Sequence, residues 1–135
     1  MVASMKQRKV FNDTLFFYTA DNGAHCNESP DSVACGGINI GRSTGGVRGC
    51  KASTWEGGIR VPGFLVWPEM ISTHRETWVP AVTHDFLPTI MEALGVTSDN
   101  PTFPLDGMSL MPFITAPTSA AIPSSRPKPI GFWWG

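Results

Sequence analysis

The stretch TLFFYTADNG, residues 14–23, decides the fold class of this chain. Its first part is a continuous run of apolar and β-prone side chains, which is typical of a strand buried on both faces in the centre of a parallel sheet. The run ends at Asp21, Asn22 and Gly23, which together are a strong turn signal. The stretch therefore predicts an α/β protein whose mostly parallel central sheet is flanked by helices.

A glycine-rich loop follows this turn. Nine glycines lie from position 23 to position 58, and almost no hydrophobic periodicity accompanies them. A stretch of this length without regular structure is usually either functional or disordered. Trp55 and Ile59 favour an ordered loop, because a disordered linker lacks such apolar anchors.

A second strand and a helix are predicted after the loop. Residues 59–67 form another apolar run. Apolar side chains then recur on one face at the helical period, at Phe86, Leu87, Ile90, Met91 and Leu94. Pro88 is tolerated only in the first turn of a helix, which favours Asp85 over Thr83 as the N-cap. Gly95 is predicted to end the helix at the C′ position.

The composition changes toward the C-terminal end. Residues 105–107 predict a turn, and Ser109 is predicted to cap a short helix after it. Residues 115–129 then contain four prolines and no acidic residue, which is typical of a linker or an extended surface segment. We therefore expect residues 1–114 to form the domain and residues 115–135 to be a Pro-rich connecting segment that leads to a truncated C-terminal region.

Charge and composition exclude several classes of protein. The chain has 135 residues, with 10 Lys and Arg against 11 Asp and Glu, whereas a nucleic-acid-binding domain is normally distinctly basic. Its 14 glycines and 12 prolines argue against a helical bundle or a coiled coil. No apolar run approaches the roughly 20 residues that a membrane helix needs, and residues 1–11 lack the hydrophobic region of a signal peptide.

The cysteines leave the redox state open. Cys26, Cys35 and Cys50 show no C-x-x-C spacing, which argues against a zinc ribbon or a thioredoxin-type motif. One internal disulfide with a third unpaired cysteine and three reduced thiols are both compatible with this pattern. The compartment is therefore not decided by the cysteines.

Asp21 and Asn22 are candidate metal ligands. They follow the predicted central strand, and ligands of open α/β sheets bind beyond the carboxyl ends of the strands. A carboxylate beside an amide oxygen suits a hard cation such as Ca²⁺ or Mg²⁺. The alternative is a plain turn, because D-N-G is a common turn tripeptide.

Lys51 is a candidate anion-binding residue. It lies in GCKASTWEGGIRVP, residues 49–62, where glycines allow close approach of a ligand and the lysine adds a compact positive charge. The segment does not match a P-loop, and the alternative is a solvated surface lysine. Arg42 and Arg48 are further candidates for an anionic substrate. His25 fits a loop histidine better than a ligand of a hard cation.

Taken together, these segments resemble the type I sulfatases of the alkaline-phosphatase-like superfamily, with the arylsulfatase branch nearest. The resemblance is carried, in the family's order, by TADNG at 19–23, KASTWEGGIRVP at 51–62, THDFLPTI at 83–90 and LDGMSL at 105–110. It covers about residues 12–114. It implies a fragment of an alkaline-phosphatase-like sandwich, in which residues 1–114 are the C-terminal part of a sulfatase catalytic domain.

The resemblance implies a divalent-cation hydrolase of sulfate esters with a formylglycine nucleophile. It implies that Asp21 and Asn22 ligate Ca²⁺ or Mg²⁺, and that Lys51 contacts a sulfate oxygen in catalysis. A cation and an ammonium group would both offset negative charge on the transferring sulfate. We expect Arg60 to pair with a carboxylate in the loop. Full-length relatives are expected to be lysosomal, secreted or periplasmic.

The chain departs from the family at the nucleophile. The C-x-P-S-R or C-x-P-A-R motif that supplies formylglycine is absent, and further family ligands of the metal and the sulfate are missing with it. We therefore expect the N-terminal part of the domain to be missing and the chain alone to be inactive. Two alternatives stay open: a non-catalytic anion- or partner-binding remnant, and a phosphodiesterase or phosphonate hydrolase of the same superfamily. The W-E-G-G-I-R-V-P block and Lys51 favour the sulfatase.

Overall fold

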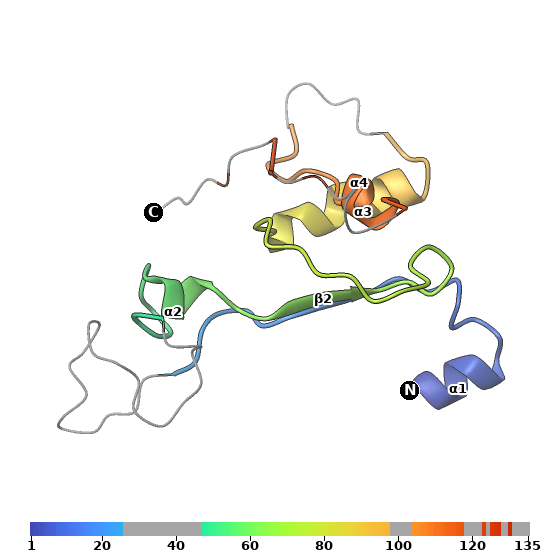
Figure 1. The fold of residues 1–135 in the computed structure, drawn as a ribbon, viewed down its shortest axis with the longest axis horizontal. Coiled ribbons are helices and arrows are strands. Elements are labelled where there is room, and N and C mark those ends of the chain that lie inside the picture. Colours follow the sequence, from blue (N-terminus) through green and yellow to red (C-terminus); the bar gives the residue numbers. More distant parts are fainter. Residues whose placement is uncertain (26–46, 98–103, 118–122, 124, 128–129, 131–135) are drawn as a thin grey trace. The chain divides into compact units, whose positions relative to one another are not determined.

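The computed structural model describes residues 1–25, 47–97, 104–117, 123, 125–127 and 130. The chain divides into two units, one of Phe16–Val66 and the other of Met1–Leu15 with Trp67–Gly135. Figure 1 colours the chain from its N-terminus in blue to its C-terminus in red.

The unit Phe16–Val66 is built on a two-stranded antiparallel sheet. Strand β1, Phe16–Thr19, pairs with strand β2, Gly63–Val66, and the two lie side by side in Figure 1. Tyr18 is opposite Phe64, and their rings stack with centroids 4.5 Å apart. Between the strands, the described residues form one short helix, α2, Glu56–Ile59.

The sequence predicted the positions of both strands, but it did not predict how exposed their side chains are. The prediction that the first strand is buried on both faces is wrong for this structure, because Tyr18 is 54% exposed and Phe64 is 56% exposed. Only one strand pairs with β1 among the described residues, and no further strand of that part of the chain extends the sheet. The described strands are antiparallel, and the mostly parallel sheet therefore stays a prediction. The second strand was predicted to begin at Ile59, which instead ends α2.

The other unit contains the predicted helix, with the predicted ends. A 3₁₀ turn, η1, Thr83–Asp85, leads into α3, Phe86–Ala93, whose N-cap residue is Asp85. Gly95 has a φ of +66°, a left-handed conformation that glycine adopts without strain. Its N–H donates to the Glu92 carbonyl (3.0 Å), and the Val96 N–H donates to the Met91 carbonyl (2.8 Å). These two bonds make a Schellman motif, which confirms the predicted helix end.

Two short helices complete this unit, α1, Val2–Gln7, and α4, Met111–Ile114. The Met111 N–H donates to the Ser109 hydroxyl oxygen at 3.1 Å, so the predicted capping by Ser109 is confirmed. The Arg75 guanidinium donates to the carbonyls of Ile114 (2.7 Å) and Ala116, where a cation stabilises the end of a helix. Helices α3 and α4 pack against each other (Figure 1).

The described residues bury little apolar surface. Their buried apolar side chains are Cys50, Ile114 and Ala116, whereas Leu87 and Leu94 of the apolar face of α3 are 55% and 73% exposed. The apolar face of α3 is therefore largely uncovered. None of the helices in the described ranges is long and apolar enough to cross a bilayer.

Candidate metal and anion site

Backbone hydrogen bonds join the segment that carries Asp21 to the loop that carries Lys51. The Gly23 N–H donates to the Gly58 carbonyl at 2.8 Å, and the Lys51 N–H donates to the Ala24 carbonyl at 2.8 Å. The chain just after β1 therefore runs beside the glycine-rich loop. The two predicted functional segments, far apart in the sequence, meet in one place.

The glycines of this loop are needed for that close approach. A Cβ added to Gly23 would overlap the Gly57 carbonyl, and one added to Gly57 would overlap the carbonyls of Gly49 and Arg48. These obstacles are backbone atoms, which cannot turn aside as a flexible side chain could. The glycine pairs in the sequence thus permit three stretches of backbone to lie in contact.

A tight turn presents Lys51. The Ser53 N–H and the Ser53 hydroxyl both donate to the Cys50 carbonyl, at 3.0 and 2.8 Å. Ala52, beside Lys51, has a φ of +68°, a conformation that costs a non-glycine residue energy and is held by the surrounding loop. Cys50 is 2% exposed and disulfide-bonded, so a disulfide exists and the alternative of three reduced thiols is wrong. Cys26 and Cys35 lie outside the described residues.

Asp21 and Lys51 are available for external ligands. Both side chains are exposed, and neither forms an ion pair within the described ranges. Asp21 Oδ1 accepts the Asn22 N–H at 3.0 Å, which orients the carboxylate. The remaining oxygens of Asp21 and Asn22 are hard donors of the kind that Ca²⁺ and Mg²⁺ prefer, so the pair fits such a cation.

The described residues do not complete a cation site. Ca²⁺ takes about 6–8 oxygen ligands, more than Asp21 and Asn22 can supply. Among the residues that the structure describes, no group of three His, Cys, Asp or Glu side chains could hold a metal ion. The rest of any coordination shell must come from elsewhere.

The remaining candidate residues lie in or near the same loop, or outside the described residues. Arg60 Nη1 lies 3.6 Å from Glu56 Oε2, which confirms that Arg60 pairs with a carboxylate, although both side chains are more than half exposed. His25 is exposed. Arg48 lies over the ring of Trp55. Arg42 lies outside the described residues.

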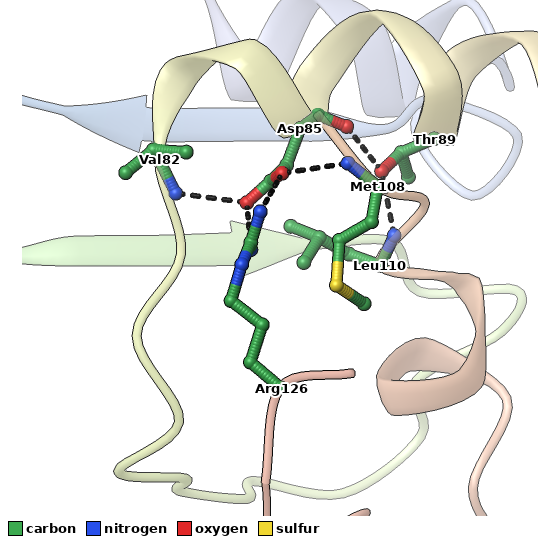
Figure 2. A network of polar contacts seen from close by, with 6 residues as sticks. All are labelled: Val82, Asp85, Thr89, Met108, Leu110 and Arg126. Atoms are coloured by element: carbon green, nitrogen blue, oxygen red, sulfur yellow. Dashed lines mark hydrogen bonds and ion pairs between the residues drawn. The ribbon is translucent and has the colours of Figure 1, made fainter. Parts of the chain in front are cut away.

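The sequence analysis missed a buried polar network around Asp85 (Figure 2). Asp85 was predicted as an N-cap, yet its carboxylate does not cap α3. It accepts the backbone N–H groups of Val82 and Met108, each at 2.9 Å, and a bidentate pair from Arg126 at 2.6 and 2.8 Å. The Asp85 side chain is fully buried and that of Arg126 is 8% exposed.

Thr89 extends the network by one step (Figure 2). Its hydroxyl donates to the Asp85 carbonyl at 2.6 Å and accepts the Leu110 N–H at 2.8 Å. Asp85 and Thr89 thus hold the segment 108–110 through backbone N–H groups, which any residue type can supply. The signal in the sequence was the recurrence of polar residues in THDFLPT, but nothing there identified Arg126 as the partner. Since no buried polar side-chain atom of the described residues lacks a hydrogen-bond partner, we interpret the network as structural.

The Arg126 pair lowers the pKa of Asp85. Burial alone raises the pKa of a carboxyl group, but the hydrogen bonds from Arg126, Met108 and Val82 and the charge of Arg126 outweigh it. The pKa of Asp85 therefore lies below its ordinary value of 3.8. The carboxylate stays ionised in neutral and mildly acidic solution.

The stability of the chain is expected to fall in acid for this reason. A carboxyl group whose pKa is lowered on folding stabilises the folded state. This contribution is complete at pH values above the pKa of the unfolded state, and it is lost as the pH falls toward the pKa of the folded state. We expect the Asp85 contribution to be constant from about pH 7 to about pH 5 and to shrink below about pH 4. Urea unfolding at several pH values measures this. An Asp85→Asn variant is the control, and a decline of equal size in both proteins would contradict the assignment.

Comparison with known proteins adds a second line of evidence. The family model described as Sulfatase matches residues 1–96 of this chain. The steryl-sulfatase of Homo sapiens is 37% identical over 110 residues, which are 82% of this chain and 18% of that protein. Arylsulfatase A of Bos taurus is 34% identical over 111 residues, which are 78% of this chain and 18% of that protein. The chain spans less than a fifth of the length of these curated relatives.

Proposed function

The chain belongs to the sulfatase family, and we propose that it carries part of the catalytic site of a sulfuric ester hydrolase. The family implies an alkaline-phosphatase-like α/β fold. Within that fold, residues 1–114 would be the C-terminal part of the catalytic domain, with a mostly parallel sheet flanked by helices. Residues 115–135 would be the connecting segment. A sulfate ester would be the substrate of the whole domain, and the N-terminal part of the domain would supply the remaining groups.

Asp21, Asn22 and Lys51 would be the functional residues of this part. The Asp21 and Asn22 oxygens would hold Ca²⁺ or Mg²⁺, and the Lys51 ammonium group would contact a sulfate oxygen. A bound divalent cation supplies charge stabilisation for the transferring group. Lys51 would add a point charge on the same group, and the disulfide of Cys50 would limit the movement of the turn that carries it.

One observation carries this proposal. The hydrogen bonds Gly23 to Gly58 and Lys51 to Ala24 bring a free carboxylate and a free ammonium group into one small unit of the chain, where neither has an internal counter-ion in the described ranges. A carboxylate and an ammonium group that both lack a counter-ion can bind a cation and an anion together. A sulfate held with a divalent cation is such a ligand. A plain turn and a solvated lysine would not require this backbone convergence.

The chain alone is expected to bind sulfate without hydrolysing it. We expect no turnover of 4-nitrophenyl sulfate, because the formylglycine motif is absent and Cys50 is held in a disulfide. In the presence of Ca²⁺, an NMR titration with inorganic sulfate should shift the resonances of residues 21–24 and 50–53. Lys51→Ala should weaken this binding about tenfold or more, since a hydrogen bond from a charged group contributes about 1.5–3 kcal/mol.

Lys9→Ala is the matched control, because Lys9 is also exposed but lies in the other unit. Equal effects of the two substitutions would contradict the role of Lys51. Turnover that a chelator abolishes would contradict the expected inactivity. Binding without turnover would also fit a non-catalytic remnant. The two hypotheses differ in that only the sulfatase hypothesis expects a productive complex with the rest of a sulfatase domain.

A further inference from the structure

Asn22 and Gly23 form an Asn–Gly pair at the start of the glycine-rich loop. Asparagine is a thermolabile residue, because the backbone nitrogen of the next residue can attack its side-chain amide. A glycine in that next position favours the attack, since it is conformationally free and has no side chain in the way. Both residues are partly exposed, so water can reach the pair.

The reaction at such a pair is deamidation, and it needs only the chain and water. The Gly23 nitrogen gives its proton to a base in solution and forms a bond to Cγ of Asn22. The bond from Cγ to the side-chain nitrogen breaks, and this nitrogen takes a proton from water and leaves as ammonia. Water then opens the resulting cyclic succinimide to aspartate or isoaspartate. The amide of Asn22 is thus replaced by a carboxylate beside Asp21.

In the folded chain, a hydrogen bond occupies the Gly23 nitrogen. Its N–H donates to the Gly58 carbonyl at 2.8 Å. A group that donates a hydrogen bond in its protonated form loses that proton less readily, and the bond also fixes the direction of the N–H. The Lys51 N–H donates to the Ala24 carbonyl at 2.8 Å, which holds the next residue against the same loop. The Gly23 nitrogen can therefore react only after the loop has moved away.

The same close contact requires a glycine at position 23. A Cβ there would overlap the Gly57 carbonyl and crowd the Gly58 Cα, and both obstacles are backbone atoms. A larger residue after Asn22 would slow deamidation, but it does not fit this packing. The fold therefore demands a reactive Asn–Gly pair and protects it with the same contact.

We infer that Asn22 is a deamidation site whose reaction is held back by the hydrogen bond from Gly23 to Gly58. Local opening of the loop, without unfolding of the whole chain, frees the Gly23 nitrogen. The rate of deamidation at Asn22 then follows the fraction of molecules in which this bond is broken. The inference is independent of the proposed function, because neither sulfate nor a metal ion takes part in the reaction or in its measurement.

Mass spectrometry tests this on the whole 135-residue chain, incubated at mildly alkaline pH in buffer and in guanidinium chloride. After reduction and digestion with trypsin, residues 10–42 form one fragment, in which Asn12 followed by Asp13 is an internal control. Asn22 should deamidate about tenfold or more slowly in buffer than in denaturant, since loop contacts commonly protect an amide by such a factor. Equal rates in the two solutions, or no reaction at Asn22 in denaturant, would overturn the inference.

Gly57→Ala tests the role of the loop in a single buffer. The added Cβ would overlap the carbonyls of Gly49 and Arg48, so the loop should open more often and Asn22 should deamidate about tenfold faster than in the wild type. Gly63→Ala is the matched control, because a Cβ there makes only an ordinary contact, and its rate should equal that of the wild type. Asn22→Gln should abolish the mass change at this position, because the longer side chain cyclises far less readily.

A series of low denaturant concentrations on the wild type covers the case in which Gly57→Ala does not fold. At each concentration, circular dichroism confirms that the chain is folded. Deamidation at Asn22 and hydrogen exchange at the Gly23 amide are then measured on the same sample, and the two rates should rise together. An Asn22 rate that stays constant while the Gly23 amide exchanges faster would overturn the inference.

Discussion

Replacing Arg126 with methionine is expected to lower the free energy of unfolding by about 3–5 kcal/mol, the cost of removing one partner of a buried ion pair. Arg126 makes a bidentate contact with a fully buried Asp85, and its own side chain is 8% exposed. Without the guanidinium, the carboxylate keeps two backbone N–H donors but loses its counter-ion. Since a small domain has about 5–15 kcal/mol of stability in total, this loss is severe.

Urea or thermal unfolding followed by circular dichroism measures the effect of Arg126→Met. Arg126→Lys keeps the charge but cannot form the bidentate pair. Its free energy of unfolding should therefore lie between those of Arg126→Met and the wild type. Arg8→Met is the surface control, and it should change stability by less than about 0.5 kcal/mol. A similar stability of Arg126→Met and Arg8→Met would show that the buried pair does not contribute as described.

Replacing Gly57 with alanine is expected to distort the glycine-rich loop that carries Lys51. The added Cβ would overlap the carbonyls of Gly49 and Arg48, which are backbone atoms on the facing stretch of the loop. Forcing a methyl group into such a space typically costs about 1–3 kcal/mol and sometimes more. The hydrogen bond from the Gly57 N–H to the Arg48 carbonyl, 2.6 Å long, should break as the backbone moves apart.

Amide hydrogen exchange gives a direct measurement of that movement. In Gly57→Ala, we expect the amides of Gly23, Lys51 and Gly57 to exchange about tenfold faster or more, the factor that corresponds to about 1.4 kcal/mol of lost protection. Gly63→Ala is the matched control, because a Cβ there meets only the Tyr18 carbonyl at 3.7 Å, an ordinary contact. Unchanged exchange in Gly57→Ala would mean that close backbone approach does not hold the site together.

Local chemistry made part of this structure predictable. The helix at 86–93 was expected because its apolar spacing, its proline in the first turn and the glycine at its end each act over a few residues. The capping by Ser109 and the pairing of Arg60 with Glu56 are equally local. The strands were located for the same reason, but the environment of β1 depends on chain far from it, and that prediction failed.

The sequence by itself determined the family, the helix ends and the residue types of the candidate site, because motifs and periodicities depend on neighbours along the chain. Only the tertiary structure decided which distant groups meet. It brought Gly23 to Gly58, Ala24 to Lys51 and Asp85 to Arg126. Such pairings depend on the path of the backbone between them, and the partners are often backbone N–H and C=O groups that carry no sequence signal. From the sequence, Asp85 is therefore predicted to be a helix cap, and only the folded structure shows that its carboxylate pairs with Arg126.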